Sequence, residues 1–90
     1  MLAKEAAIKA KDFLLELLGN EVGGIRLEEV ELDTKEGFWY ITLSYYLKSQ
    51  DPLETLTGGI HKRFYRKFKI KNDDNGIVVD MKIRELEHAE

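Results

Sequence analysis

The period of the hydrophobic pattern changes once, near Gly23, and this change constrains the fold more than any other feature of the sequence. Before it, apolar residues recur three and four positions apart, which is the spacing of a helix with one buried face. After it, apolar and polar residues alternate, which is typical of strands with one buried and one wet face. One helix followed by a β-sheet is therefore expected.

The helix is predicted over residues 2–18. Gly19-Asn20 tolerates a positive φ, where helices commonly end, and Gly23-Gly24 is expected to make the turn into the sheet. The apolar positions assigned to the buried face of the helix are Ala3, Ala6, Ala7, Ala10, Phe13, Leu14, Leu17 and Leu18.

Four strands are predicted after the helix. In the first, the parity of the alternation shifts at Glu28-Glu29, which indicates a β-bulge. Turns are predicted at residues 34–37 and, from the Asn and Gly content, at residues 72–76. The side chains expected to face the helix are Trp39, Ile41, Leu43, Tyr45 and Leu47, then Phe64, Phe68 and Ile70, and finally Ile77, Val79, Met81 and Ile83, with Val78 and Asp80 outward.

A length of 90 residues leaves room for one domain, with residues 87–90 as a polar tail. The expected fold is α+β, with one N-terminal helix packed on a curved four-stranded antiparallel meander. No uninterrupted apolar stretch suits export or membrane spanning, so a cytoplasmic protein is expected.

Catalytic and metal-binding chemistry is not expected. The chain has no cysteine, which excludes disulfides and thiolate chemistry. His61 and His88 lack metal-ligand spacing. Glu28, Glu29 and Glu31 are assigned to a solvated face of an edge strand, where acid-base chemistry has no desolvated site. No enzyme activity, metal, cofactor or small-molecule substrate is therefore predicted.

Three stretches together with the opening helix resemble PepSY-type and cystatin-like domains. They are residues 27–32 (LEEVEL), 38–47 (FWYITLSYYL) and 68–78 (FKIKNDDNGIV). The chain is also similar to a group of short bacterial hypothetical proteins that end in a comparable hairpin. The resemblance implies the same α+β fold and the binding or regulation of a protein partner, and it carries over no catalytic residue. Asn75 departs from the pattern, which usually has Thr before the glycine.

Positive charge is concentrated on the third strand. Residues 61–71 hold six Lys and Arg and no Asp or Glu, although the net charge of the chain is −3. This strand either forms cross-strand pairs with acidic neighbours or, with its aromatic side chains, binds single-stranded nucleic acid. Arg66 is expected on the opposite face of this strand, with Phe64 and Phe68 on either side of it. It is read either as an arginine whose stem packs while its head reaches water or Glu16, or as an anion anchor.

Two functions are predicted on these grounds. The first is a small non-catalytic protein-interaction or regulatory module, which includes self-association. The alternative is a nucleic-acid-binding accessory that uses the basic strand. Residues 49–59 form a long excursion that is read either as a contact site or as a cover for the sheet edge. The candidate contact residues are Tyr40, Tyr46, Leu53, Leu56, Arg63, Tyr65, Lys67 and Lys69.

Overall fold

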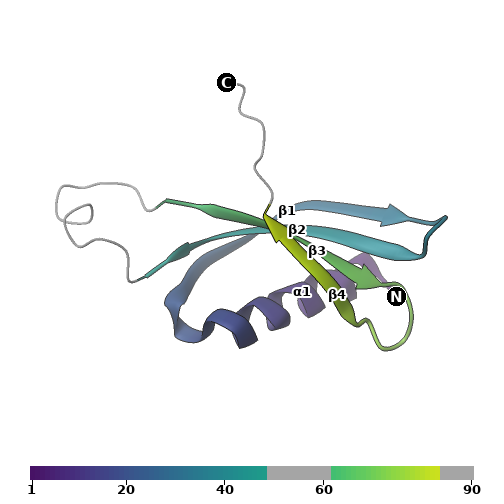
Figure 1. Cartoon of the computed structure of the whole chain (residues 1–90), viewed down its shortest axis with the longest axis horizontal. Coiled ribbons are helices and arrows are strands. Elements are labelled where there is room, and N and C mark those ends of the chain that lie inside the picture. The colour runs from purple at the N-terminus through teal and green to yellow at the C-terminus, as the bar shows by residue number, and fades with distance from the viewer. Residues whose placement is uncertain (49–61, 84–90) are drawn as a thin grey trace, which may run out of the picture.

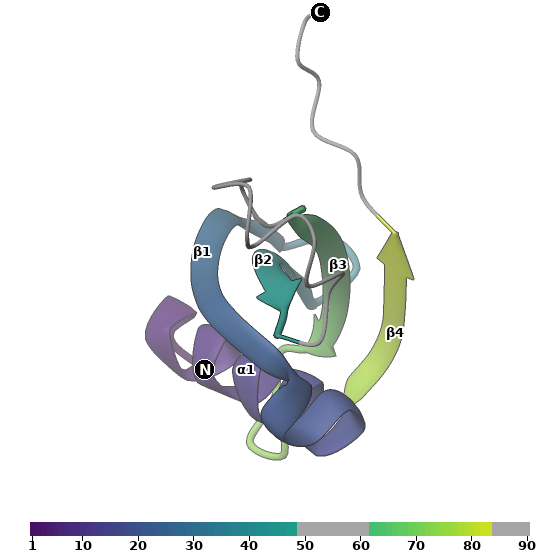
Figure 2. The same ribbon diagram turned by 90° about the vertical axis from the view of Figure 1, so that its left-hand side faces the viewer.

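The computed structural model describes residues 1–48 and 62–83. Helix α1 (Ala3–Leu18) and the short 3-10 helix η1 (Gly19–Glu21) precede strands β1 (Val22–Asp33), β2 (Phe38–Leu47), β3 (Phe64–Lys71) and β4 (Val78–Ile83). The strands form one antiparallel sheet in the order β1-β2-β3-β4, and α1 lies along one face of it (Figures 1 and 2). The predicted α+β meander is confirmed, with β1 and β4 as the two edges of the described sheet.

Helix α1 contacts the sheet through apolar residues about one turn apart. Ala6, Ala10 and Leu14 are completely buried, and their spacing of four residues places them in one row on the helix. The Glu5 carboxylate accepts a 2.8 Å hydrogen bond from the Leu2 backbone N–H at the start of the helix. The helix ends where the sequence predicts, at Gly19, whose φ is 61°.

Strand β2 supplies the largest share of the core. Its helix-facing side chains Trp39, Ile41, Leu43 and Tyr45 are buried, as predicted. Phe68 and Ile70 on β3 are also fully buried and lie opposite Ile41 and Trp39 in the sheet register. The Phe13 and Phe68 rings are nearly perpendicular, with 6.2 Å between their centroids. Burial of each large apolar side chain of this kind stabilises the fold by about 1.5–3 kcal/mol.

Gly23 and Gly24 do not form the turn that the sequence predicts. They lie inside β1, and the connection from α1 is made by η1. The Tyr46 ring packs against both glycines, so that a Cβ placed on Gly23 would lie 2.7 Å from Tyr46 Cε1. The pairing with β2 shifts between Gly23 and Arg26, and Gly24 has a φ of 58°. The two glycines therefore permit an irregular strand under an aromatic ring, which glycine allows because it has no side chain.

The predicted bulge in β1 is confirmed. Leu27 pairs with Leu43 and Glu29 pairs with Thr42, which leaves Glu28 as the extra residue. The shift keeps Leu27 and Val30 on the helix side of the sheet, although two residues separate them.

The predicted orientation of β4 is wrong for its first residues. Val78 pairs with Ile70 and is half-buried against the core, whereas Val79 is 49% exposed. The pairing shifts between Lys69 and Ile70, so an extra residue on β4 reverses the alternation at this point. Two further residues that were expected to face inward are also largely exposed, Ile77 at 55% and Ile83 at 73%.

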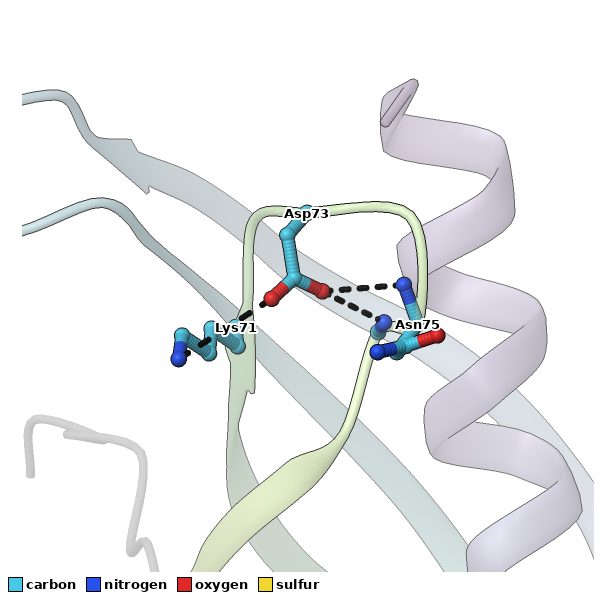
Figure 3. Close-up of polar contacts among 4 residues, drawn as sticks. Lys71, Asp73 and Asn75 are labelled. Carbon is cyan, nitrogen blue, oxygen red and sulfur yellow. Dashed lines mark hydrogen bonds and ion pairs between the residues drawn. The ribbon is translucent and has the colours of Figure 1, made fainter.

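The predicted turn between β3 and β4 is closed by an aspartate. Asp73 Oδ1 accepts 2.9 Å hydrogen bonds from the backbone N–H groups of Gly76 and Asn75 (Figure 3). The Lys71 ammonium lies 4.0 Å from the other carboxylate oxygen. The hydrogen bond from Gly76, then that from Asn75, and the charge of Lys71 outweigh partial desolvation and lower the pKa of Asp73. Gly76 has a φ of 59°, which completes the turn.

Candidate interaction surface

The predicted contact residues on the sheet share one face. Tyr40 and Tyr46 on β2, Arg63 just before β3, and Tyr65, Lys67 and Lys69 on β3 all alternate with the helix-facing residues. We call this the outer face. All six side chains are half-buried. Leu53 and Leu56, the rest of the 49–59 segment, His61 and His88 lie outside the described residues.

Two polar residues of the outer face are buried, which the sequence analysis did not predict. Thr42 is 1% exposed and Ser44 is fully buried. Thr42 donates a 3.1 Å hydrogen bond to Glu29, and Ser44 donates a 2.6 Å hydrogen bond to Glu28. The bulge places these two consecutive glutamates on the same face, and it is the signal that could have revealed the pairing. Glu28 and Glu29 therefore hold β1 to β2, in addition to any contact with solvent.

Arg63 and Tyr46 secure the beginning of β1. Arg63 Nε donates a 3.2 Å hydrogen bond to Ser44 Oγ, and its Nη2 donates to the backbone carbonyl of Gly24. The Tyr46 ring covers that glycine. Both side chains thus have a structural role in joining the strands, independent of any partner.

The lysines of the outer face lie over aromatic rings of β2. Lys67 Nζ is 4.9 Å from the centroid of the Tyr40 ring, and Lys69 Nζ is 4.3 Å from that of Phe38. A cation–π contact at an exposed site contributes about 0.5–1 kcal/mol, and a contact that is partly shielded from water contributes at least as much. Ring faces therefore stabilise the positive charges of Lys67 and Lys69, whereas pairing with carboxylates was expected.

A small basic hollow surrounds Tyr40. It has a volume of about 150 Å³ and is lined by Tyr40, Lys67, Lys69, Asp80 and Lys82. Lys67 and Lys82 lie directly opposite each other across β3 and β4, which is an unfavourable arrangement of like charges. Asp80, opposite Lys69 and 3.6 Å from Lys82, reduces this repulsion.

Arg66 has its head engaged on the helix side of the sheet. Its guanidinium carbon lies 5.9 Å from the Tyr45 ring centroid and 5.7 Å from the Phe64 ring centroid. Its Nη1 donates a 2.9 Å hydrogen bond to the backbone carbonyl of Tyr65. These contacts agree with an arginine whose side chain packs on the protein. The guanidinium lies near two aromatic rings, whereas water or the Glu16 carboxylate was expected there.

The structure also shows a surface that the sequence analysis did not identify, an apolar groove between α1 and β1. Ile8, Leu27 and Val30 are 47%, 52% and 41% exposed along it. Val22 and Ile25 at the start of β1 pack with the core, whereas Leu27, Val30 and Leu32 further along the strand remain largely exposed. The groove has a volume of about 370 Å³ and is lined by Ala3, Lys4, Ala7, Ile8, Lys11, Ile25, Leu27, Val30 and Leu43. Its outer boundary is the edge strand itself.

Within residues 1–48 and 62–83, no three His, Asp or Glu side chains gather closely enough to hold a metal ion. None of the helices in this part of the chain has the length and apolar character needed to cross a membrane.

Comparison of the chain with models of known protein families, with curated proteins and with solved structures gave no match. The resemblance to PepSY-type and cystatin-like domains therefore remains a prediction from the sequence.

Proposed function

We propose that this domain is a non-catalytic protein-interaction module that binds an extended segment of a partner along the edge of β1. The observation that carries the proposal is the coincidence of an edge strand with an apolar groove of about 370 Å³ beside it. Strand addition uses these two features together: the backbone edge gives affinity, and pockets for alternate side chains give specificity.

The edge of β1 is regular where an added strand needs it to be. Five consecutive residues, 29–33, pair with β2 without a shift. In an antiparallel pair, every second residue of an edge strand directs its N–H and C=O away from its neighbour. Among the described residues, no strand covers the backbone groups on that side of β1, and we propose that a partner binds them.

The groove lies on the side of β1 where an added strand would place half of its side chains. Leu27 and Val30 line it from the strand, and Ile8 lines it from the helix. Exposed apolar side chains that lie together in this way are typical of binding sites, whereas single ones need no explanation. A partner that covers them removes apolar surface from water while it extends the sheet.

The proposal is tested by selecting binders from a random peptide library and mapping them by backbone amide exchange. Binders are expected to protect the amides of residues 29–33 from exchange and to shift the NMR signals of Ile8 and Val30. The substitution Val30→Asp is expected to abolish binding. Val79→Asp is the matched control, because Val79 is an exposed valine on the opposite edge strand. Binders that protect β4 or the outer face would contradict the proposal.

Nucleic-acid binding remains the second candidate, on the basis of the basic hollow around Tyr40. A backbone phosphate could contact Lys67, Lys69 and Lys82, with a base stacked near the tyrosine. The test is a titration with single-stranded oligonucleotide at two salt concentrations. Binding that weakens steeply with salt, and that is lost in Lys67→Glu, would favour this function.

A further inference from the structure

We infer that the segment bound at the β1 edge alternates apolar residues with lysine or arginine. This inference rests on the proposed function and specifies the chemistry of the partner. It follows from the different character of the two sides of β1 over residues 29–33.

The side chains of this stretch alternate between an apolar side and an acidic side. Val30 and Leu32 lie opposite Ile41 and Trp39, on the helix side, and are 41% and 38% exposed. Glu29 and Glu31 lie opposite Thr42 and Tyr40, on the outer face, and both are exposed. The side chains of a strand added to the sheet follow the same pleat as those of its neighbour. One half of the partner's side chains would therefore lie beside valine and leucine, and the other half beside glutamates.

Opposite charges on directly adjacent strands are favourable, and like charges are unfavourable. Lysine or arginine beside Glu31 thus stabilises the complex on the outer face, and Glu29, whose carboxylate also accepts the hydrogen bond from Thr42, adds to the negative charge there. On the groove side, Lys4 and Lys11 form part of the lining and repel a cation there. The distribution of charge therefore fixes which side of the partner strand enters the groove, and a shift by one residue would reverse every contact.

The same charges disfavour a second copy of this chain as the occupant. If two β1 strands paired antiparallel about Val30, Glu29 of each copy would lie opposite Glu31 of the other. If they paired about Glu31, the two Glu31 side chains would face each other, and Glu29 would face Asp33. Every such register places carboxylates opposite carboxylates, so the edge resists self-association while it accepts a basic partner.

The test uses three synthetic peptides and the whole chain. The first alternates Lys and Val over nine residues. The second alternates Glu and Val. The third has the composition of the first, with the lysines and valines in separate blocks. Binding is measured by fluorescence anisotropy and mapped by amide exchange. The Lys/Val peptide is expected to bind and to protect residues 29–33 from exchange. Its affinity is expected to fall as salt is added. The blocked peptide is expected to bind at least tenfold more weakly.

Charge reversal on the domain gives the second arm of the test. The substitution Glu31→Lys is expected to weaken binding of the Lys/Val peptide at least tenfold and to strengthen binding of the Glu/Val peptide. Glu36→Lys is the matched control, because Glu36 is an exposed glutamate in the turn between β1 and β2 and leaves the edge unchanged.

The outcomes separate the two proposals. Equal binding of the Lys/Val and Glu/Val peptides at residues 29–33 overturns the inference and leaves strand addition intact. Absence of protection at β1 with these peptides and with library binders overturns both. Sedimentation of the domain alone tests for dimerisation. A concentration-dependent dimer in which amide exchange shows protection of β1 would identify the occupant as a second copy, and would overturn the inference.

Discussion

The Ser44 hydroxyl donates a 2.6 Å hydrogen bond to Glu28 Oε2, although Ser44 lies on the face of the sheet away from α1. Ser44 is fully buried, and its oxygen also accepts a hydrogen bond from Arg63 Nε. One hydroxyl thus joins β1, β2 and the residue that precedes β3. The outer face is held together by polar contacts and is more than a solvated surface.

Removal of this hydroxyl should destabilise the domain. Ser44→Ala leaves the half-buried Glu28 carboxylate and the Arg63 guanidinium without their shared partner. We expect a loss of about 1.5–3 kcal/mol, the range for hydrogen bonds that involve charged groups. The measurement is urea unfolding followed by the fluorescence of Trp39, the single tryptophan of the chain. Thr34→Ala in the exposed turn is the control, and equal midpoints for the two variants would contradict the prediction.

The contact between Tyr46 and Gly24 should make a methyl group unusually costly at this position. Gly24 and Gly37 both have a positive φ, 58° and 78°. A Cβ on Gly24 would lie 2.5 Å from Tyr46 Cε2, whereas none of the surrounding atoms lies within 4 Å of a Cβ on Gly37. Gly37→Ala should therefore lose only the backbone term, about 1–2 kcal/mol, and Gly24→Ala should lose more.

A second substitution isolates the contribution of the ring. In a Tyr46→Ser background the steric conflict is absent, so the additional cost of Gly24→Ala should fall to that of Gly37→Ala. Thermal or urea unfolding of the four variants gives the comparison. An additional cost that persists without the ring would show that the backbone, and not Tyr46, requires glycine here.

The stability of the domain should fall in acid through Asp73. The backbone hydrogen bonds from Gly76 and Asn75 and the nearby Lys71 lower the pKa of this carboxyl in the folded state. A lowered folded-state pKa gives stability that is present above the unfolded-state pKa of about 4 and is lost as the pH falls through the folded-state pKa. Asp73→Asn should therefore destabilise the domain at neutral pH and have a smaller effect near pH 2. Asp74→Asn is the control, since it removes the same charge one residue away, and a difference independent of pH would refute the assignment.

Much of the fold was predictable because it depends on local patterns. The change of period near Gly23 predicts the helix and the strands, the parity shift at Glu28 predicts the bulge, and the Asn and Gly content of residues 72–76 predicts the turn. The outward position of Lys67 and Lys69 also follows from alternation. Each of these features is encoded in residues that lie close together in the sequence.

The features that were missed depend on contacts between distant residues. The burial of Thr42 and Ser44 needs acceptors from β1, and the sequence shows only two small polar residues on a wet face. The apolar groove depends on where α1 lies across the sheet, and the helical period defines which face is buried but not which strands it covers. A turn was predicted at Gly23 and Gly24 because two consecutive glycines are typical of turns. The packing of the Tyr46 ring on them is a contact between distant residues that the sequence does not show.

The orientation of β4 provides the most direct comparison between the sequence pattern and the structure. The alternation places Val79 inward and Val78 outward, whereas the structure places Val78 beside Ile70 and leaves Val79 49% exposed. Because the two residues are both valine, the local sequence does not indicate which of them faces the helix. The extra residue in the pairing with β3 determines it. Val78→Ala should therefore cost about 1–2 kcal/mol through lost apolar burial, and Val79→Ala less than about 0.5 kcal/mol. The two variants remove the same atoms from neighbouring positions on one strand, so each is the control for the other in urea unfolding. The reverse order of stabilities would mean that β4 keeps regular alternation and that the shift between Lys69 and Ile70 is absent in solution.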